Sequence, residues 1–216
     1  LWLCGYLQQQ GLKPGIISRG YGADVTSPRL VQAVDVAAEV GDEPLLLARR
    51  SGCPVVVCRN RVAAAEYLLA NTEANIIISD DGLQHYRIKR DLEIVLVDGT
   101  RGLGNGFVLP AGPLREPAGR LKQADIVIAN SQPYSAAHGL MTLEPEQAQA
   151  LVGDGVLVPP ATVSLVAGIG NPERFHLTAV SCGFQIKQRY FFGDHHQFSL
   201  QDLADISGPL LMTEKD

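Results

Sequence analysis

One unbroken strand–helix–strand unit occupies residues 54–82, PVVVCRNRVAAAEYLLANTEANIIISDDG. Residues 54–58 and 76–79 are short, continuous apolar runs, which predicts strands that are buried on both faces. The segment between them, residues 61–70, predicts a helix, and Asn60 just before it is a plausible N-cap. Two strands joined by a helix are expected to run parallel, because a parallel connection needs a crossover of this length.

The same alternation continues on both sides of this unit. Further strands are predicted at residues 15–18, 92–98 and 126–129, with a weaker one at 30–34, and a helix is predicted at 44–50. Continuous apolar strands alternating with helices favour an α/β fold, in which a parallel sheet is covered by helices on both faces.

The first residues also have a helical pattern. Leu1, Leu3, Cys4 and Leu7 fall on one face, which predicts a helix that begins at Leu1, and Gly11 fits its C-cap. The segment has neither a basic n-region nor a small-residue cleavage site, so it is not typical of a signal peptide.

A change of composition divides the chain. Residues 131–160 are polar and then proline-containing, which predicts a linker. A shorter unit follows, with expected strands at 162–167, 187–192 and 209–212 and expected helices at 172–181 and 200–206. We therefore predict a core domain over residues 1–156 and a smaller C-terminal α/β domain over 157–216.

Composition and charge exclude several classes of protein. The chain has 216 residues, of which 46% are hydrophobic and 19% charged, so it is expected to be a globular protein rather than a disordered or fibrous one. The net charge of −5 disfavours a dedicated nucleic-acid binder. The longest uncharged stretch, residues 155–172, contains prolines and several glycines, which is not typical of a spanning helix.

The segment IIISDDGLQH ends a predicted buried strand in two carboxylates. Open α/β sheets bind ligands at the carboxyl ends of their strands, so Asp80 and Asp81 stand where a metal site is expected. Mg²⁺ needs only one or two carboxylates, and Gln84 offers another oxygen. The plainer interpretation, a DDG turn after a strand, stays open.

Two further motifs carry groups suited to acid–base chemistry. GDEP places Asp42 and Glu43 at a helix N-terminus, where the helix dipole stabilises an ionised carboxylate. DHHQF places His195 after a strand, and histidine is the usual proton acceptor near neutral pH. Simple helix capping and a buried loop histidine are the alternatives.

Three loops could hold an anion. SRGYG presents Arg19, and LPAGPLREP presents Arg115 and Glu116 from a proline-stiffened segment. GIGNPERF follows a strand and opens a helix, although it lacks the third glycine of a dinucleotide fingerprint. Each of these segments could equally be an ordinary surface connection.

Taken in series, the motifs resemble one family closely, the tetraacyldisaccharide 4′-kinases of lipid A biosynthesis. The resemblance is carried by SRGYG, GDEP, DDGLQH with RDLEIVLVD, GNG with LPAGPLREP, GIGNPERF, DHHQF and MTEKD. It implies a fold like that of P-loop kinases. It also implies transfer of the γ-phosphate of ATP, with Mg²⁺, to the 4′-hydroxyl of a lipid disaccharide 1-phosphate. The implied location is peripheral, at the cytoplasmic face of the bacterial inner membrane.

The resemblance also implies residue roles. Asp42 and His195 match the family's catalytic pair, and Asp81 and Gln84 match its Mg²⁺ site with Asp80 beside them. The residues expected to contact substrate or phosphate are Arg19, Glu43, Arg61, His85, Arg115 and Glu116. No nucleic-acid partner and no obligate protein partner is expected.

One motif of P-loop kinases does not occur in the 216 residues, the GxxxxGK[ST] loop that holds the β- and γ-phosphates. In the family this loop lies just before the helix that is expected here to begin at Leu1. We therefore assign no ATP-binding residue in this chain and expect the sequence to be an internal part of a longer protein. We also expect the chain by itself to have little or no kinase activity.

Two other functions compete with the kinase. One is a metal-dependent phosphoesterase that would use Asp80, Asp81, Asp194, His195 and His196 around two metal ions. The other is a non-catalytic α/β module that binds a nucleotide or a glycan, in which substitution of Asp42 or His195 would leave binding unchanged.

Overall fold

A computed structural model describes residues 1–151 and 153–216. Its contacts divide the chain into two compact units, one formed by residues 1–87 with 147–216 and the other by residues 88–146. This grouping differs from the sequence-based division after residue 156, which stays a prediction.

The first sheet of unit 1 has four strands in the order β2-β3-β1-β4. β1 (Pro14–Ser18) lies at its centre and pairs in parallel with both β3 (Val55–Val57) and β4 (Ile76–Ser79). β2 (Arg29–Leu30) is an antiparallel edge strand. The strand expected at residues 30–34 is shorter in the structure. Leu30 pairs with Val56 and the Val31 N–H donates to the carbonyl oxygen of Val55 at 2.8 Å, after which the chain leaves β3.

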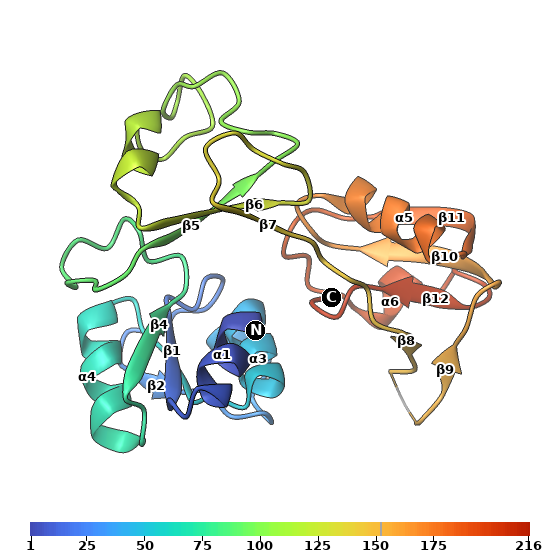
Figure 1. The fold of residues 1–216 in the computed structure, drawn as a ribbon. Coiled ribbons are helices and arrows are strands. Elements are labelled where there is room, and N and C mark those ends of the chain that lie inside the picture. The colour runs from blue at the N-terminus through green and yellow to red at the C-terminus, as the bar shows by residue number, and fades with distance from the viewer. Residues whose placement is uncertain (152) are drawn as a thin grey trace. The chain divides into compact units, whose positions relative to one another are not determined.

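Helices cover both faces of this sheet (Figure 1). α1 (Trp2–Gln9), α2 (Ala37–Val40) and α3 (Asp42–Ser51) contribute to one apolar core, in which Cys4 and Leu45 pack against Ile16. α4 (Arg61–Asn71) packs on the other face. There it approaches β1 so closely that a Cβ at Gly15 would lie 2.6 Å from a methyl carbon of Leu68.

The helix α1 begins one residue later than expected. Leu1 stands at its N-cap position, and the Leu1 carbonyl oxygen accepts the first helical hydrogen bond, from the N–H of Gly5 at 3.2 Å. Leu1 is thus the residue before the helix and not its first residue, and its apolar side chain offers no acceptor for a cap.

The crossover helix α4 begins where the sequence predicts. The Asn60 side chain accepts hydrogen bonds from the backbone N–H groups of Val62 and Ala63, which satisfies two of the orphan donors of the first turn. The apolar residues Ala64 and Leu68, one helical turn apart, are fully buried against the sheet. The predicted strand–helix–strand unit is therefore confirmed.

A second parallel sheet in unit 1 has the order β11-β10-β12. Its central strand, β10 (Thr162–Ala167), is buried from its second residue onward, and it is flanked by β11 (Gln185–Phe191) and β12 (Leu210–Met212). α5 (Pro172–Ser181) is capped by the Asn171 side chain, and a capping box opens α6 (Leu200–Leu203). α6 is shorter than the helix expected over residues 200–206.

Short strands lie in the segment that was predicted to be a linker. β8 (Ala148–Gln149) and β9 (Val156–Leu157) form a small antiparallel pair in unit 1. β7 (Gly139–Met141) belongs to unit 2, where it completes a parallel sheet with β5 (Ile94–Asp98) and β6 (Ile126–Asn130). A 3-10 helix, η1 (Ala118–Gln123), precedes β6. The linker prediction was wrong here because backbone pairing with β6 outweighs the polar composition.

The α/β class with parallel sheets is confirmed.

Candidate active site

The first residue of α3, Asp42, is presented by an unusual backbone. Gly41 immediately before it has φ 93° and ψ 149°, a conformation that is almost restricted to glycine. A Cβ at Gly41 would also lie 2.9 Å from the carbonyl oxygen of Tyr21. Asp42 then accepts a hydrogen bond at Oδ1 from the backbone N–H of Glu43, at 2.8 Å. The helix start thus fixes one carboxylate oxygen and leaves Oδ2 for other partners.

His195 lies in the loop that follows β11 and contacts Asp42. Its backbone has φ 61°, and its N–H donates to the carbonyl oxygen of Gly168 at 2.9 Å. Its Nδ1 lies 2.8 Å from Oδ2 of Asp42, 153 residues away in the sequence. The Tyr21 ring stands against the imidazole with the ring centroids 5.1 Å apart. The fold therefore brings together the two residues expected to form a pair.

The pair lies in a charged network that favours an ionised Asp42. Burial raises the pKa of the Asp42 carboxyl, but the hydrogen bonds from His195 and the Glu43 N–H, together with the Lys215 charge, outweigh burial and bring the pKa below its ordinary value. Burial lowers the pKa of the Lys215 ammonium, but Asp42 and Asp194 more than compensate and raise it. Both groups are therefore charged at neutral pH.

Glu43, the next residue of α3, has a pKa that is shifted in the opposite direction to that of Asp42. Burial raises the pKa of its carboxyl, and the negative charges of Asp80 and Asp42 add to this effect against the opposing charge of Lys215. The carboxylate at the end of β4 thus acts by charge on the start of α3. Substrate contact by Glu43 stays a prediction.

The turn after β4 is built around a buried arginine. Arg61, only 5% exposed, donates from Nη1 to the Ser79 hydroxyl at 2.9 Å and to the carbonyl oxygen of Asp80, and from Nη2 to the carbonyl oxygen of Asp81 at 3.2 Å. These bonds satisfy carbonyl groups of the turn, in which Asp81 has φ 45°. Arg61 therefore shapes this turn, and its direct contact with substrate stays a prediction.

The carboxylates of this turn have the donor chemistry that Mg²⁺ requires. Asp80 accepts a hydrogen bond at Oδ2 from the Ser18 hydroxyl, 3.2 Å away at the end of β1, so oxygen atoms from two neighbouring strands meet here. Asp81 and Gln84 follow in the same turn. An all-oxygen set with one or two carboxylates fits a hydrated Mg²⁺. Across residues 1–151 and 153–216, no three His, Cys, Asp or Glu side chains gather as a metal-binding group.

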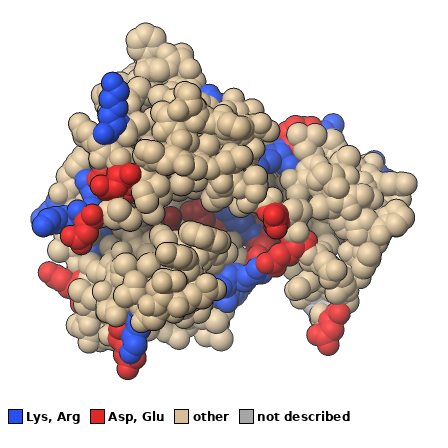
Figure 2. Space-filling view, viewed as in Figure 1, with Lys and Arg blue, Asp and Glu red and all other residues tan. Residues whose placement is uncertain are grey.

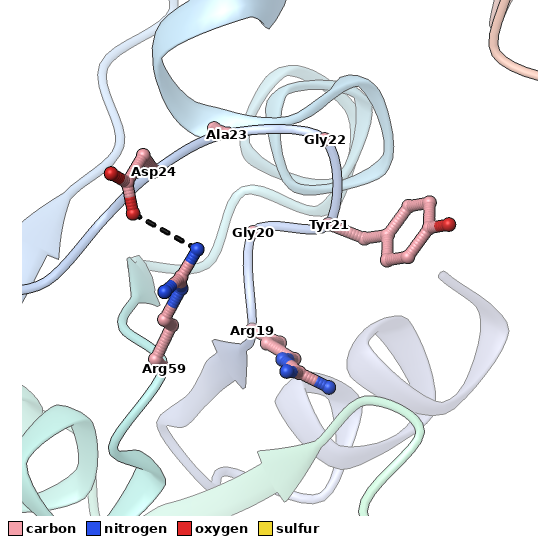
Figure 3. A pocket seen from close by; sticks show the side chains of 7 residues that line it. All are labelled: Arg19, Gly20, Tyr21, Gly22, Ala23, Asp24 and Arg59. Atoms are coloured by element: carbon pink, nitrogen blue, oxygen red, sulfur yellow. Dashed lines mark ion pairs between the residues drawn. The ribbon is translucent and has the colours of Figure 1, made fainter.

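The SRGYG loop after β1 borders a cavity of about 340 Å³. Its lining includes Arg19, Tyr21 and Arg59, and Arg59 forms an ion pair with Asp24 at 3.0 Å. Figure 3 shows the Arg19 and Tyr21 side chains pointing away from this ion pair. Arg19 thus comes from the loop that also supplies the ring beside His195, and its contact with a phosphate stays a prediction.

The remaining predicted contact residues are spread over both units. His85 closes the turn after β4, where its backbone N–H donates to the carbonyl oxygen of Gly82 at 2.9 Å. Arg115 and Glu116 belong to unit 2, at the end of the proline-rich loop, and Glu116 pairs with Arg120 at 3.3 Å. The roles of all three residues toward a substrate stay predictions.

Sequence reasoning missed several residues of this site. Lys215 lies 3.4 Å from Oδ2 of Asp42 and 3.3 Å from Oδ1 of Asp194, yet the sequence assigned no role to it. Asp194 entered only as a ligand of the competing phosphoesterase, and Ser18 was not singled out. The available signal for Lys215 was the motif MTEKD. It is one of the segments that carry the family resemblance, and no chemical role had been assigned to it.

Two observations concern the surface and the membrane. On the face drawn in Figure 2, acidic and basic side chains stand in small mixed groups. Among residues 1–151 and 153–216, no helix combines the length and the apolar character that crossing a membrane requires.

Comparison with known proteins identifies the family. The family model "LpxK: Tetraacyldisaccharide-1-P 4'-kinase" matches residues 1–216. The tetraacyldisaccharide 4'-kinase of Shewanella sp. (strain MR-7) is 47% identical over 220 residues, covering 100% of this chain and 66% of that protein. The enzyme of the same name from Legionella pneumophila (strain Lens) is 49% identical over 213 residues, covering 97% of this chain and 66% of that protein. The chain thus spans 66% of the length of these curated relatives.

A solved structure supports the fold independently. It is a crystal structure of the "apo" form of LpxK from Aquifex aeolicus in complex with ATP, and it matches this chain with a TM-score of 0.76 at 23% sequence identity. The match covers 100% of this chain and 72% of that one. Because the family model extends over every residue, the chain belongs to the tetraacyldisaccharide-1-P 4'-kinase family.

Proposed function

We propose that this chain supplies the base and the magnesium site of a lipid kinase. The enzyme transfers the γ-phosphate of ATP to the 4′-hydroxyl of a tetraacyldisaccharide 1-phosphate, a step of lipid A biosynthesis. The single observation that carries the proposal is the 2.8 Å contact between Nδ1 of His195 and Oδ2 of Asp42, in a chain whose family is shown.

The contact supports one route for the proton. A neutral imidazole has one donor and one acceptor nitrogen, so with Nδ1–H donating to Asp42, Nε2 of His195 is the acceptor. Nε2 takes the proton of the 4′-hydroxyl while that oxygen bonds to the γ-phosphorus. The bond between the γ-phosphorus and the β–γ bridging oxygen breaks, and ADP leaves. Asp42 orients the imidazole and stabilises its protonated form.

The other groups neutralise and position the phosphates. Asp80, Asp81 and Gln84 would hold Mg²⁺, which supplies charge neutralisation for the phosphate oxygens. Arg61 keeps the turn that presents them in one conformation through its bonds to the backbone. Arg19, Glu43, His85, Arg115 and Glu116 are the proposed contacts with substrate or phosphate.

The proposal extends to partners and to the isolated chain. Its lipid substrate places the enzyme at the cytoplasmic face of the bacterial inner membrane as a peripheral protein, with no nucleic acid and no obligate protein partner. The GxxxxGK[ST] loop that holds ATP phosphates in P-loop kinases does not occur in these 216 residues. We infer that the chain alone has little or no kinase activity.

The test uses a chimera in which this chain replaces the matching segment of the full-length Shewanella relative. In that enzyme, Asp42→Asn and His195→Ala are each expected to lower kcat by roughly 10²–10⁴-fold, because each removes part of the general base. ATP affinity should stay nearly constant, since neither residue is proposed to hold the nucleotide.

A matched control is His176→Ala. His176 is partly exposed on α5 and pairs with Glu173 at 3.1 Å, so its removal should leave kcat unchanged. Activity of the chimera that survives loss of both Asp42 and His195 would rule out the base pair and favour a binding module. Hydrolysis of phosphate esters without ATP would favour the phosphoesterase.

A further inference from the structure

The motif MTEKD, residues 212–216, begins with the last residue of β12 and continues as a turn. The Thr213 hydroxyl donates to Oδ2 of Asp216 at 2.7 Å, and the Asp216 N–H donates to the carbonyl oxygen of Thr213 at 3.1 Å. Oδ1 of Asp216 accepts from the backbone N–H of Gly168 at 2.9 Å. The turn is therefore anchored to the end of β10, and Lys215 is placed by this anchor.

Gly168 connects this turn to the histidine loop. Its N–H binds Asp216, and its carbonyl oxygen accepts from the N–H of His195 at 2.9 Å. A Cβ at this position would lie 3.1 Å from Cβ of His196 and 3.2 Å from Oδ1 of Asp216, which is tighter than ordinary contact. One residue thus sets the positions of both Lys215 and His195.

The Lys215 side chain extends from this turn into the charged network and is only 19% exposed. Its Nζ lies 3.4 Å from Oδ2 of Asp42, the same oxygen that contacts His195, and 3.3 Å from Oδ1 of Asp194. The more distant Glu43 carboxylate stands at 3.9 Å. The lysine therefore bridges carboxylates that come from α3 and from the histidine loop.

Two of these carboxylates, Asp42 and Asp194, flank the imidazole. Asp42 contacts Nδ1 of His195, while Oδ2 of Asp194 stands 3.7 Å from Nε2. Two nearby negative charges favour the imidazolium, which cannot accept a proton. A cation between the carboxylates opposes this effect and also restrains the oxygen to which Nδ1 is bound.

We propose that Lys215 is a positioning residue for the Asp42–His195 pair: it holds Oδ2 of Asp42 in place and offsets the two carboxylates that flank the imidazole. The inference rests on the proposed function, because the pair must be the base for its position to affect catalysis. It gives the MTEKD motif a role in the reaction without contact to substrate.

The direct readout is the protonation of His195, followed by NMR of the imidazole C–H signals in the 216-residue chain. The groups that face this ring or act on it by charge are Asp42 and Glu43 from α3, Tyr21 from the loop after β1, and Asp194 with Lys215. Lys215→Met should raise the titration midpoint of His195, because a positive charge close to the two carboxylates that flank the imidazole is lost. Lys215→Arg should restore the midpoint.

The control is Lys187→Met. Lys187 lies on β11 and donates to the Ser207 hydroxyl at 3.2 Å, so it belongs to the same sheet but not to the network. Its loss should leave the His195 midpoint unchanged. Should Lys215→Met unfold the chain in a thermal melt, Lys215→Gln provides the same loss of charge with a polar side chain.

In the chimeric enzyme, Lys215→Met should lower kcat at neutral pH about tenfold or more with an unchanged KM for ATP, because a displaced base reacts slowly. Since the base must be deprotonated to react, the acid limb of the pH profile of kcat should move to higher pH. An unchanged His195 midpoint, or wild-type kcat in both charge-loss variants, would overturn the inference. If Asp42→Asn and His195→Ala are also fully active, the proposed function fails; if only those two collapse, the role of Lys215 alone fails.

Discussion

The turn after β4 and the loop after β11 are similar in position and different in how they are held. Both follow a strand of a parallel sheet, and each contains a non-glycine residue with positive φ, Asp81 at 45° and His195 at 61°. The first is fastened by Arg61, which is 5% exposed and binds backbone carbonyl groups. The second is fastened by side-chain ion pairs among Asp42, His195 and Lys215, which remain 16–28% exposed.

The difference suggests a division of tasks. A buried cation that satisfies carbonyl groups is costly to remove, so it gives the proposed magnesium turn a single conformation. Partly exposed ion pairs contribute little stability but respond to charge and pH. Such pairs suit the proposed base, which must gain and lose a proton in each turnover.

The largest effect is expected for Arg61→Met. The substitution removes the donors to Ser79, Asp80 and Asp81 from a buried position, which should lower the free energy of unfolding by about 3–5 kcal/mol. Urea denaturation followed by circular dichroism measures this change. Binding of Mg²⁺ by the folded variant, followed by calorimetry, should weaken at the same time.

A matched control lies two residues earlier in the chain. Arg59 is 59% exposed and pairs at the surface with Asp24, so Arg59→Met should change the free energy of unfolding by less than about 1 kcal/mol. Equal losses in the two variants would contradict the contrast between a buried and an exposed cation.

An intermediate effect is expected for Gly41→Ala, at the start of the ion-paired region. The φ of 93° is strained for alanine, and the new Cβ would lie 2.9 Å from the carbonyl oxygen of Tyr21. We expect a loss of about 2–3 kcal/mol, together with a shift of the His195 NMR signals as Asp42 moves.

Gly22→Ala separates strain from crowding. Gly22 also has a positive φ, 86°, but no described atom lies within 4 Å of the place that a Cβ would take, so its substitution should cost only about 1 kcal/mol. A Gly22 variant as unstable as the Gly41 variant would show that backbone strain alone governs both positions.

The sequence predicts the elements well where local signals agree with tertiary packing. The helix over α4 was found because Asn60 caps it and Leu68 faces the sheet, and β4 and β10 begin and end at the predicted residues. β7 was missed because Gly139–Met141 has little strand signal of its own and is fixed by pairing with β6.

The site shows the same limit more strongly. Asp42 and His195 were expected to meet because the family resemblance pairs them, and the contact is present at 2.8 Å. Arg61 was expected to contact substrate because of the family resemblance, and that contact stays a prediction. Its burial and its bonds to the turn after β4 were missed, because an arginine in sequence carries no sign of burial. Lys215 was missed because its partners are distant in the sequence. Asp42 lies 173 residues before it and Asp194 lies 21 residues before it.

The smallest effect is expected in the pH dependence of stability. The pKa of Asp42 is lowered from 3.8. Its contribution to the free energy of unfolding is therefore present above that value and is lost as the pH falls through the lowered pKa. The pKa of Lys215 is raised from 10.5. Its contribution to the free energy of unfolding is therefore present below that value and is lost as the pH rises through the raised pKa. Their mutual attraction should therefore stabilise the fold on a plateau between about pH 4 and pH 10, by on the order of 1 kcal/mol.

The difference between wild type and Lys215→Met in urea denaturation isolates this contribution from the other titrating groups. It should be largest near neutral pH, shrink toward acid pH as Asp42 is protonated, and shrink toward alkaline pH as Lys215 loses its charge. The Arg61→Met difference should stay large at acid pH, because the hydrogen-bond partners of Arg61 are a hydroxyl and backbone carbonyl oxygens, which do not titrate. Only the added attraction of the Asp80 and Asp81 carboxylates is lost there. Two parallel pH curves would show that the two regions are held by the same kind of interaction.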